Sequence, residues 1–111
     1  MGISDETTTI QQLKNLVLAF HKERNWGESH KPRNISISIC LEAAELLELF
    51  QWDNRNDEGS LKTDNKYQLL KDELSDVIIY CLTMANSMHI DLSESITHKM
   101  EKNAEKYPVP R

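Results

Sequence analysis

Cysteine is scarce in this chain of 111 residues, and neither of its two cysteines belongs to a CxxC pattern. Cys40 and Cys81 lie in apolar runs with helical spacing, so we expect reduced core residues of a cytoplasmic protein, with a disulfide between them as the less favoured alternative. Long hydrophobic runs are also lacking, since none approaches the roughly 18 apolar residues of a membrane span. The start MGISDE carries no targeting pattern, so we expect no association with a membrane.

The chain also lacks repeats, low-complexity tracts and any stretch that reads as a domain linker. We therefore expect a single domain over residues 1–111, with an ordered core from about residue 8 to residue 107. A chain this short buries no more than about two thirds of the surface that it exposes when unfolded. A deep site for a large ligand would therefore need a second subunit.

Basic residues are outnumbered, because 13 Lys and Arg stand against 18 Asp and Glu for a net charge of −5. Proteins that bind nucleic acid without specificity need clustered positive charge, so no nucleic acid polymer is expected as a partner. The acidic balance still permits a phosphorylated ligand if a metal ion mediates the contact.

What the sequence does contain is strong helical periodicity, which predicts an all-α fold. Thr8 or Thr9 can cap the first helix, with Gln11 or Gln12 in a capping-box position. The predicted helices run from there to about Asn25, from Asn34 to Trp52, from Asp64 to Met88, and from a cap at Ser93 to about Lys106. Apolar residues cover nearly all of the circumference of the second helix, which predicts a central, buried element.

Two acids of the second helix occupy positions where a folded helix should carry no charge. Glu42 falls inside the apolar stripe, and Glu45 lies roughly 60° away at its edge. A carboxylate in an apolar face costs several kcal/mol unless a partner satisfies it, and no Lys or Arg lies within a turn of either acid. The third helix repeats the arrangement with Glu73 and Asp76.

If these helices pack antiparallel, the four carboxylates converge and require either protonation or a cation. Ligand sets made only of oxygen select hard ions, with Mg²⁺ first and Mn²⁺ second, whereas zinc is disfavoured and a di-iron site would need Glu-x-x-His. A solvated acidic face is the alternative interpretation. Glu48 extends the acids by another turn and is either a third ligand, a base that orients water, or a surface residue.

Mg²⁺ held by carboxylates usually keeps positions open for substrate phosphates, so phosphoanhydride hydrolysis is the leading reaction class. Several basic residues are available to neutralise a phosphate chain, and charge alone does not choose among them. They are Arg24, Arg33, Lys66, Lys71, Lys99, Lys102 and Lys106. Trp26 and His30 share a predicted loop, where the simpler interpretation is a Trp that covers the core beside a solvated His.

An ordered set of motifs covers residues from about Phe20 to Pro108: FHKERNW, HKPRN, E-x-x-E-L-x-E-L-F-Q-W, ELSDVIIY and KM…KYP. In this set the chain resembles the all-α nucleoside triphosphate pyrophosphohydrolases of the MazG-like family, and most of all its small dCTP pyrophosphatase branch. The resemblance implies a four-helix bundle-like fold, completed by assembly into a homodimer or homotetramer. It also implies hydrolysis of a nucleoside triphosphate, with dCTP as the preferred substrate, to the monophosphate and pyrophosphate.

The resemblance also assigns roles to residues of this sequence. The metal ligands it implies are Glu42, Glu45, Glu73 and Asp76. We select Glu42 and Glu45 as catalytic acids and add Glu48 from its position on the helix, not from the resemblance. The implied nucleotide contacts are Trp26, His30, Trp52 and Tyr80, with Arg33 and Lys99 as the basic residues that we select for the substrate.

The chain departs from this pattern at Val17, where some dCTP-selective relatives place a polar residue that contacts the nucleotide. On a helical wheel His21 points about 40° beyond the face of Val17, so we do not expect it to fill the gap. Base preference is therefore open at this point. Two other functions remain as alternatives: a non-catalytic nucleotide-binding or helical interaction module, and a structural bundle with protonated buried acids.

Overall fold

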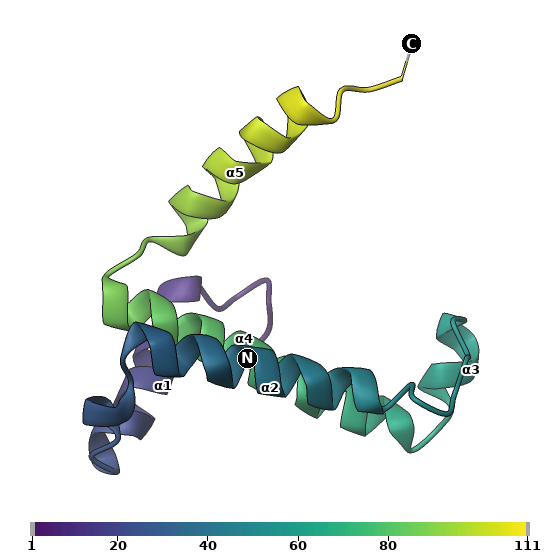
Figure 1. The fold of residues 1–111 in the computed structure, drawn as a ribbon, viewed down its shortest axis with the longest axis horizontal. Helices are drawn as coiled ribbons and strands as arrows, with labels where there is room; N and C mark the ends of the chain where they lie inside the picture. Colours follow the sequence, from purple (N-terminus) through teal and green to yellow (C-terminus); the bar gives the residue numbers. More distant parts are fainter. Residues whose placement is uncertain (1, 111) are drawn as a thin grey trace.

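The computed structural model describes residues 2–110, and this part of the chain contains helices and turns but no strand (Figure 1). The helices are α1 (Ile10–Glu23), the short 3-10 helix η1 (Gly27–Ser29), α2 (Pro32–Glu48), α3 (Glu58–Lys62), α4 (Lys66–Met88) and α5 (Leu92–Lys106). The predicted all-α fold is confirmed. Within residues 2–110, no helix combines the length and apolar character required to cross a bilayer.

A capping box begins α1. The backbone N–H of Gln12 donates to Thr9 Oγ1 at 3.1 Å, and the backbone N–H of Thr9 donates to Gln12 Oε1 at 2.7 Å. Of the two threonines considered from the sequence, Thr9 is therefore the cap. These two bonds satisfy donors that the first turn of a helix would otherwise leave without partners.

The long helices α2 and α4 lie side by side and run in opposite directions, and α1 packs against α4 (Figure 1). The buried apolar residues lie where these helices meet and are Val17, Ile35, Leu82 and Ala85. The antiparallel packing on which the convergence of the four acids was conditional is therefore present.

The second helix is shorter and more exposed than predicted. It ends at Glu48, and Leu49–Trp52 forms a turn instead of a final helical turn. Ile35 is its one fully buried residue, whereas Leu41 and Leu47 are 61% and 70% exposed. The reason is that α4 covers only one side of α2 within the chain, so the prediction of a centrally buried helix is wrong for the single chain.

The cysteine prediction is half right. Both thiols are free, as expected, and Cys81 is half-buried. Cys40, however, lies on the uncovered side of α2 and is exposed, so it is not a core residue of the single chain.

The last helix, α5, points away from the other helices (Figure 1). The chain turns at His89, whose φ of 54° places it in the left-handed region, and Asp91 then caps α5 by accepting from the backbone N–H of Glu94 at 3.0 Å. The predicted cap at Ser93 is therefore wrong by two residues. Ile96 and Met100 remain 54% and 60% exposed, so three helices form the packed core of the single chain.

The connection between α2 and α4 is tied down by charged side chains. Asp53 accepts hydrogen bonds from the Arg55 guanidinium and from Lys66 Nζ, both at 2.7 Å, and Arg55 also pairs with Asp64 at 2.9 Å. Lys66 Nζ in addition donates to the carbonyl oxygen of Leu49 at 2.7 Å. We call Asp53, Arg55, Asp64 and Lys66 the loop clamp. The short helix α3 lies inside this connection and was not predicted.

Candidate metal centre and adjoining cavity

Four acids meet at the interface of α2 and α4: Glu42, Glu45, Glu73 and Asp76. One carboxylate oxygen from each lies within 4.8 Å of those of the other three. The spacing explains the geometry, because residues i and i+3 are neighbours on a helix face and the two helices bring their faces together. Only Glu45 is exposed, and the other three are half-buried. We call these residues the acid cluster.

Two atoms of the acid cluster are buried without any hydrogen-bond partner in the part of the chain that the structure describes. They are Oε2 of Glu42 and Oε2 of Glu73. A buried carboxylate oxygen with no partner is costly, because burial removes the water that would stabilise its charge. The same feature therefore destabilises the protein and leaves two ligand atoms free.

The pKa values of two of these acids are consistent with this geometry. Burial, followed by the proximity of Glu45 and the negative charges of Asp76 and Glu73, raises the pKa of Glu42 to about 7. The pKa of Glu73 is raised too, with burial again the largest cause and Glu45 next. Among residues 2–110, Lys and Arg form ion pairs with other acids and with none of these four.

The acid cluster fits a hard divalent cation. All donors are carboxylate oxygens, which suit Mg²⁺ and Mn²⁺, and the two unpartnered buried oxygens are the positions that such an ion would satisfy. Glu48 is not part of the group. It is the exposed last residue of α2, and its predicted role as a ligand or base stays a prediction.

A cavity of about 420 Å³ adjoins the cluster and contains three of the four predicted nucleotide contacts, Trp26, His30 and Tyr80. Its other lining residues are Ser29, Asn34, Ile35 and Ser38. Ser38 lies one turn before Glu42 on α2, and Tyr80 lies one turn after Asp76 on α4, so the cavity is about one helical turn from the acids along both helices. The three polar residues were missed from the sequence, although the alternating serines of NISIS were a visible signal.

The remaining predicted contacts do not reach this cavity within one chain. Trp52 is 91% exposed in the turn after α2, Arg33 is exposed at the start of α2, and Lys99 is exposed on α5. Lys66, one of the basic candidates, is already engaged in the loop clamp. Their predicted roles toward the substrate stay predictions.

The loop that holds Trp26 and His30 is ordered by a set of local hydrogen bonds. The backbone N–H of Trp26 donates to the carbonyl oxygen of His21 at 3.0 Å, and Ser29 Oγ donates to the carbonyl oxygen of Trp26 at 2.9 Å. Asn34 Nδ2 donates to the carbonyl oxygen of Ser29 at 3.2 Å, which ties the loop to α2. The loop is therefore a fixed wall of the cavity.

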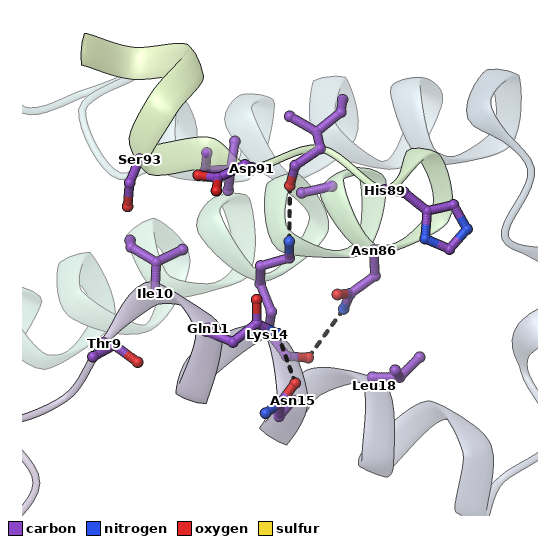
Figure 2. Close-up of a pocket in the computed structure, with 13 residues that line it drawn as sticks. Thr9, Ile10, Gln11, Lys14, Asn15, Leu18, Asn86, His89, Asp91 and Ser93 are labelled. Carbon is purple, nitrogen blue, oxygen red and sulfur yellow. Dashed lines mark hydrogen bonds between the residues drawn. The ribbon is translucent and has the colours of Figure 1, made fainter.

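A second hollow of about 540 Å³ lies between α1 and the joint of α4 with α5, away from the acid cluster (Figure 2). Lys14 is buried there and its Nζ donates to the carbonyl oxygen of Ile90 at 2.8 Å, while Asn86 Nδ2 donates to the carbonyl oxygen of Lys14 at 3.0 Å. These bonds fix α1 to the joint from which α5 leaves.

Comparison with known proteins agrees with the sequence motifs. A family model described as the MazG-like family matches residues 37–111. The dCTP pyrophosphatase 1 of Mus musculus is 37% identical over 102 residues, and that of Homo sapiens is 35% identical over the same length. In both cases the match covers 91% of this chain and 60% of the relative, so the chain spans about three fifths of the length of these proteins.

A solved structure also matches nearly the whole chain. The crystal structure of a pyrophosphatase from Archaeoglobus fulgidus DSM 4304 has a TM-score of 0.82 and 34% sequence identity, and the match covers 97% of this chain and 100% of that chain. The overall arrangement of the helices therefore has a counterpart among known folds.

Proposed function

The chain belongs to the MazG-like family, and on this premise we propose that it is a Mg²⁺-dependent nucleoside triphosphate pyrophosphohydrolase that prefers dCTP. The observation that carries the proposal is the pair of buried, unpartnered carboxylate oxygens of Glu42 and Glu73 within the acid cluster. Two buried oxygens without partners destabilise the metal-free protein. Such a feature is expected where a bound cation supplies the missing partner.

The reaction would add water to the α- or β-phosphorus and break the phosphoanhydride P–O bond between them, which gives the monophosphate and pyrophosphate. A bound Mg²⁺ would polarise phosphoryl oxygens and lower the pKa of water, with Mn²⁺ as a substitute. The acid cluster would hold the ion, and Glu42, with its pKa near 7, would release its proton on binding it. Glu45, the exposed member, would accept the proton of the attacking water, with Glu48 as a second candidate.

The adjoining cavity would hold the nucleoside. Trp26 and Tyr80 offer ring faces to a base or sugar, and Asn34 and Ser38 offer hydrogen bonds to polar edges. The preference for dCTP rests on the named activity of the two mammalian relatives, and it comes to this chain as part of the proposal.

We further propose that the active form is a homodimer or homotetramer. The uncovered sides of α2 and α5 expose large apolar residues, including Leu41, Leu47, Ile96 and Met100. A second copy would cover them, and it could also bring Trp52 or Lys99 to a cavity that they do not reach within their own chain.

The test is a panel of ribo- and deoxynucleoside triphosphates, with released pyrophosphate as the readout and Mg²⁺ present or replaced by EDTA. We expect Mg²⁺-dependent release that is fastest with dCTP. Release from another nucleotide would change only the base preference. Tight nucleotide binding without release would instead support the non-catalytic module, and no release from any nucleotide would overturn the proposed activity.

A further inference from the structure

His21 is buried beneath the loop that forms one wall of the cavity. Its side chain belongs to α1 and the residue is only 8% exposed. Its ring centroid lies 4.3 Å from that of His30 in an edge-on arrangement and 5.8 Å from that of Trp26. His21 itself does not line the cavity, whereas both of its ring neighbours do. His21 therefore contacts the two rings of the loop from the side opposite the cavity.

The main chain of His21 holds the same loop. Its carbonyl oxygen accepts the backbone N–H of Trp26 at 3.0 Å, immediately after Asn25, whose φ of 55° turns the chain in the left-handed region. A substitution of the side chain removes the ring contacts and leaves this hydrogen bond in place. The contribution of the ring can therefore be measured separately from the path of the loop.

The His21 imidazole acts as an uncharged aromatic ring. Burial, and then the nearby charges of His30 and Arg24, lower its pKa below the ordinary value of 6.5, so the ring is uncharged at neutral pH. In the described part of the chain, no protein group makes a hydrogen bond with its imidazole. The ring therefore contributes through its flat shape and its edge-on contacts, which stabilise aromatic pairs.

We propose that His21 is a positioning residue for the nucleotide cavity, which holds His30 and Trp26 in the places where they contact the base or sugar. This inference rests on the proposed function, because it assigns the origin of nucleotide affinity within the same site. It is compatible with the expectation drawn from the helical wheel, in which His21 does not replace the polar residue that some relatives carry at the position of Val17.

The test compares His21→Ala, His21→Gln and His21→Phe by steady-state kinetics on the best nucleotide of the panel, at saturating Mg²⁺ and pH 7.5. We expect Ala and Gln to raise KM about three- to tenfold, as loss of one or two aromatic contacts would. The value of kcat should stay within about twofold, because the acid cluster is untouched. His21→Phe keeps a flat neutral ring and should restore KM to near the wild-type value.

His98→Ala is the matched control, since it removes an exposed histidine of α5, and it should leave both constants unchanged. Circular dichroism verifies that each variant is folded, and if Ala does not fold, Gln and Phe decide the question. Unchanged KM in His21→Gln, or loss of kcat without a change in KM, would overturn the proposal. Failure of the proposed function itself would show differently, as a wild-type protein that releases no pyrophosphate.

Discussion

Glu42 combines a half-buried side chain, one buried oxygen without a partner and a pKa raised to about 7. Each feature opposes the charged form of the carboxyl group, and three further acids nearby make the opposition stronger. A protein selected only for stability would replace such a residue with an apolar one. Its presence is explained if a cation is bound in the working protein, since a metal ion reverses the local electrostatics.

The first prediction concerns the removal of single charges from the acid cluster. Glu42→Gln and Asp76→Asn keep side-chain size but weaken the hold on a cation, so pyrophosphate release should fall by at least about a hundredfold. Far-ultraviolet circular dichroism should remain that of the wild type. Asp72→Asn makes the same change at an exposed acid of α4 and should keep activity, and full activity in Glu42→Gln would contradict the assignment.

The second prediction concerns pH and uses metal-free protein. The folded pKa of Glu42 is about 7 against an ordinary value of 4.5, so the native state binds the proton more tightly than the unfolded state does. The resulting stabilisation is complete below about pH 4.5 and is lost as pH rises through about 7. The free energy of unfolding of the wild type, relative to that of Glu42→Gln, should therefore decrease between pH 5.5 and pH 8.

Comparison with Glu42→Gln is necessary because His21 acts in the opposite direction. Its pKa is lowered, so its contribution to stability is lost as pH falls through the ordinary value of 6.5. Chemical denaturation of both proteins at several pH values, with EDTA present, isolates the contribution of Glu42. A difference in the free energy of unfolding between the two proteins that stays constant with pH would contradict the prediction. Saturating Mg²⁺ should abolish the extra stability of the wild type at acid pH.

The acid cluster could be predicted from the sequence because its signal is local. Spacing of i and i+3 fixes which carboxylates share a helix face, and the same misplaced charge occurs twice. His21 could not be found in this way. The helical wheel describes its position on α1, whereas the loop that folds back over it depends on the left-handed turn at Asn25.

Among the elements, the existence of α2 and α4 followed from periodicity, whereas the path of the chain between them did not. Residues 53–63 lack an apolar stripe, so the sequence indicates a polar loop there and no helix. Their order comes instead from the ion pairs of Asp53, Arg55 and Lys66. Ion pairs between residues distant in sequence leave no periodic signal, so neither the loop clamp nor α3 was predictable.

The third prediction tests the loop clamp through Asp53→Asn. The carboxylate of Asp53 joins Arg55 to Lys66, whose ammonium also holds the carbonyl oxygen of Leu49 at the end of α2. Loss of its charge should loosen the connection, so amide hydrogen exchange over residues 49–65 should be faster and the melting temperature lower. Exchange within α1 should not change.

Glu58→Gln is the control for this variant. It removes an exposed ion pair with Lys62 inside the same connection, and exposed pairs contribute little to stability. It should melt close to the wild type. If both variants exchange at the wild-type rate, the loop clamp does not order the connection.

The whole molecule is more extended than its length requires. Its radius of gyration is 16.8 Å, whereas a compact domain of this size has about 13 Å. The excess comes from α5, which leaves the packed helices at Asp91 (Figure 1). Ile96 and Met100 lie one turn apart and form an apolar stripe on this helix, but amphipathicity shows only that a face requires covering. It does not show whether the same chain or another covers it.

The fourth prediction is that this stripe is an interface with a second copy. Ile96→Glu combined with Met100→Glu would place two carboxylates in the apolar contact, at a cost of several kcal/mol if they were buried without partners. Light scattering coupled to size exclusion should then give the mass of a monomer, where the wild type gives a dimer or tetramer.

His98→Glu adds negative charge on the opposite side of α5, where the side chain is 66% exposed, and should keep the wild-type mass. Pyrophosphate release separates two roles of assembly. If the partner supplies Trp52 or Lys99 to the cavity, the monomeric variant should have a much higher KM even though its own acid cluster is intact. If the double variant keeps the wild-type mass, α5 is not the interface, and the exposed apolar residues of α2 become the surface to test.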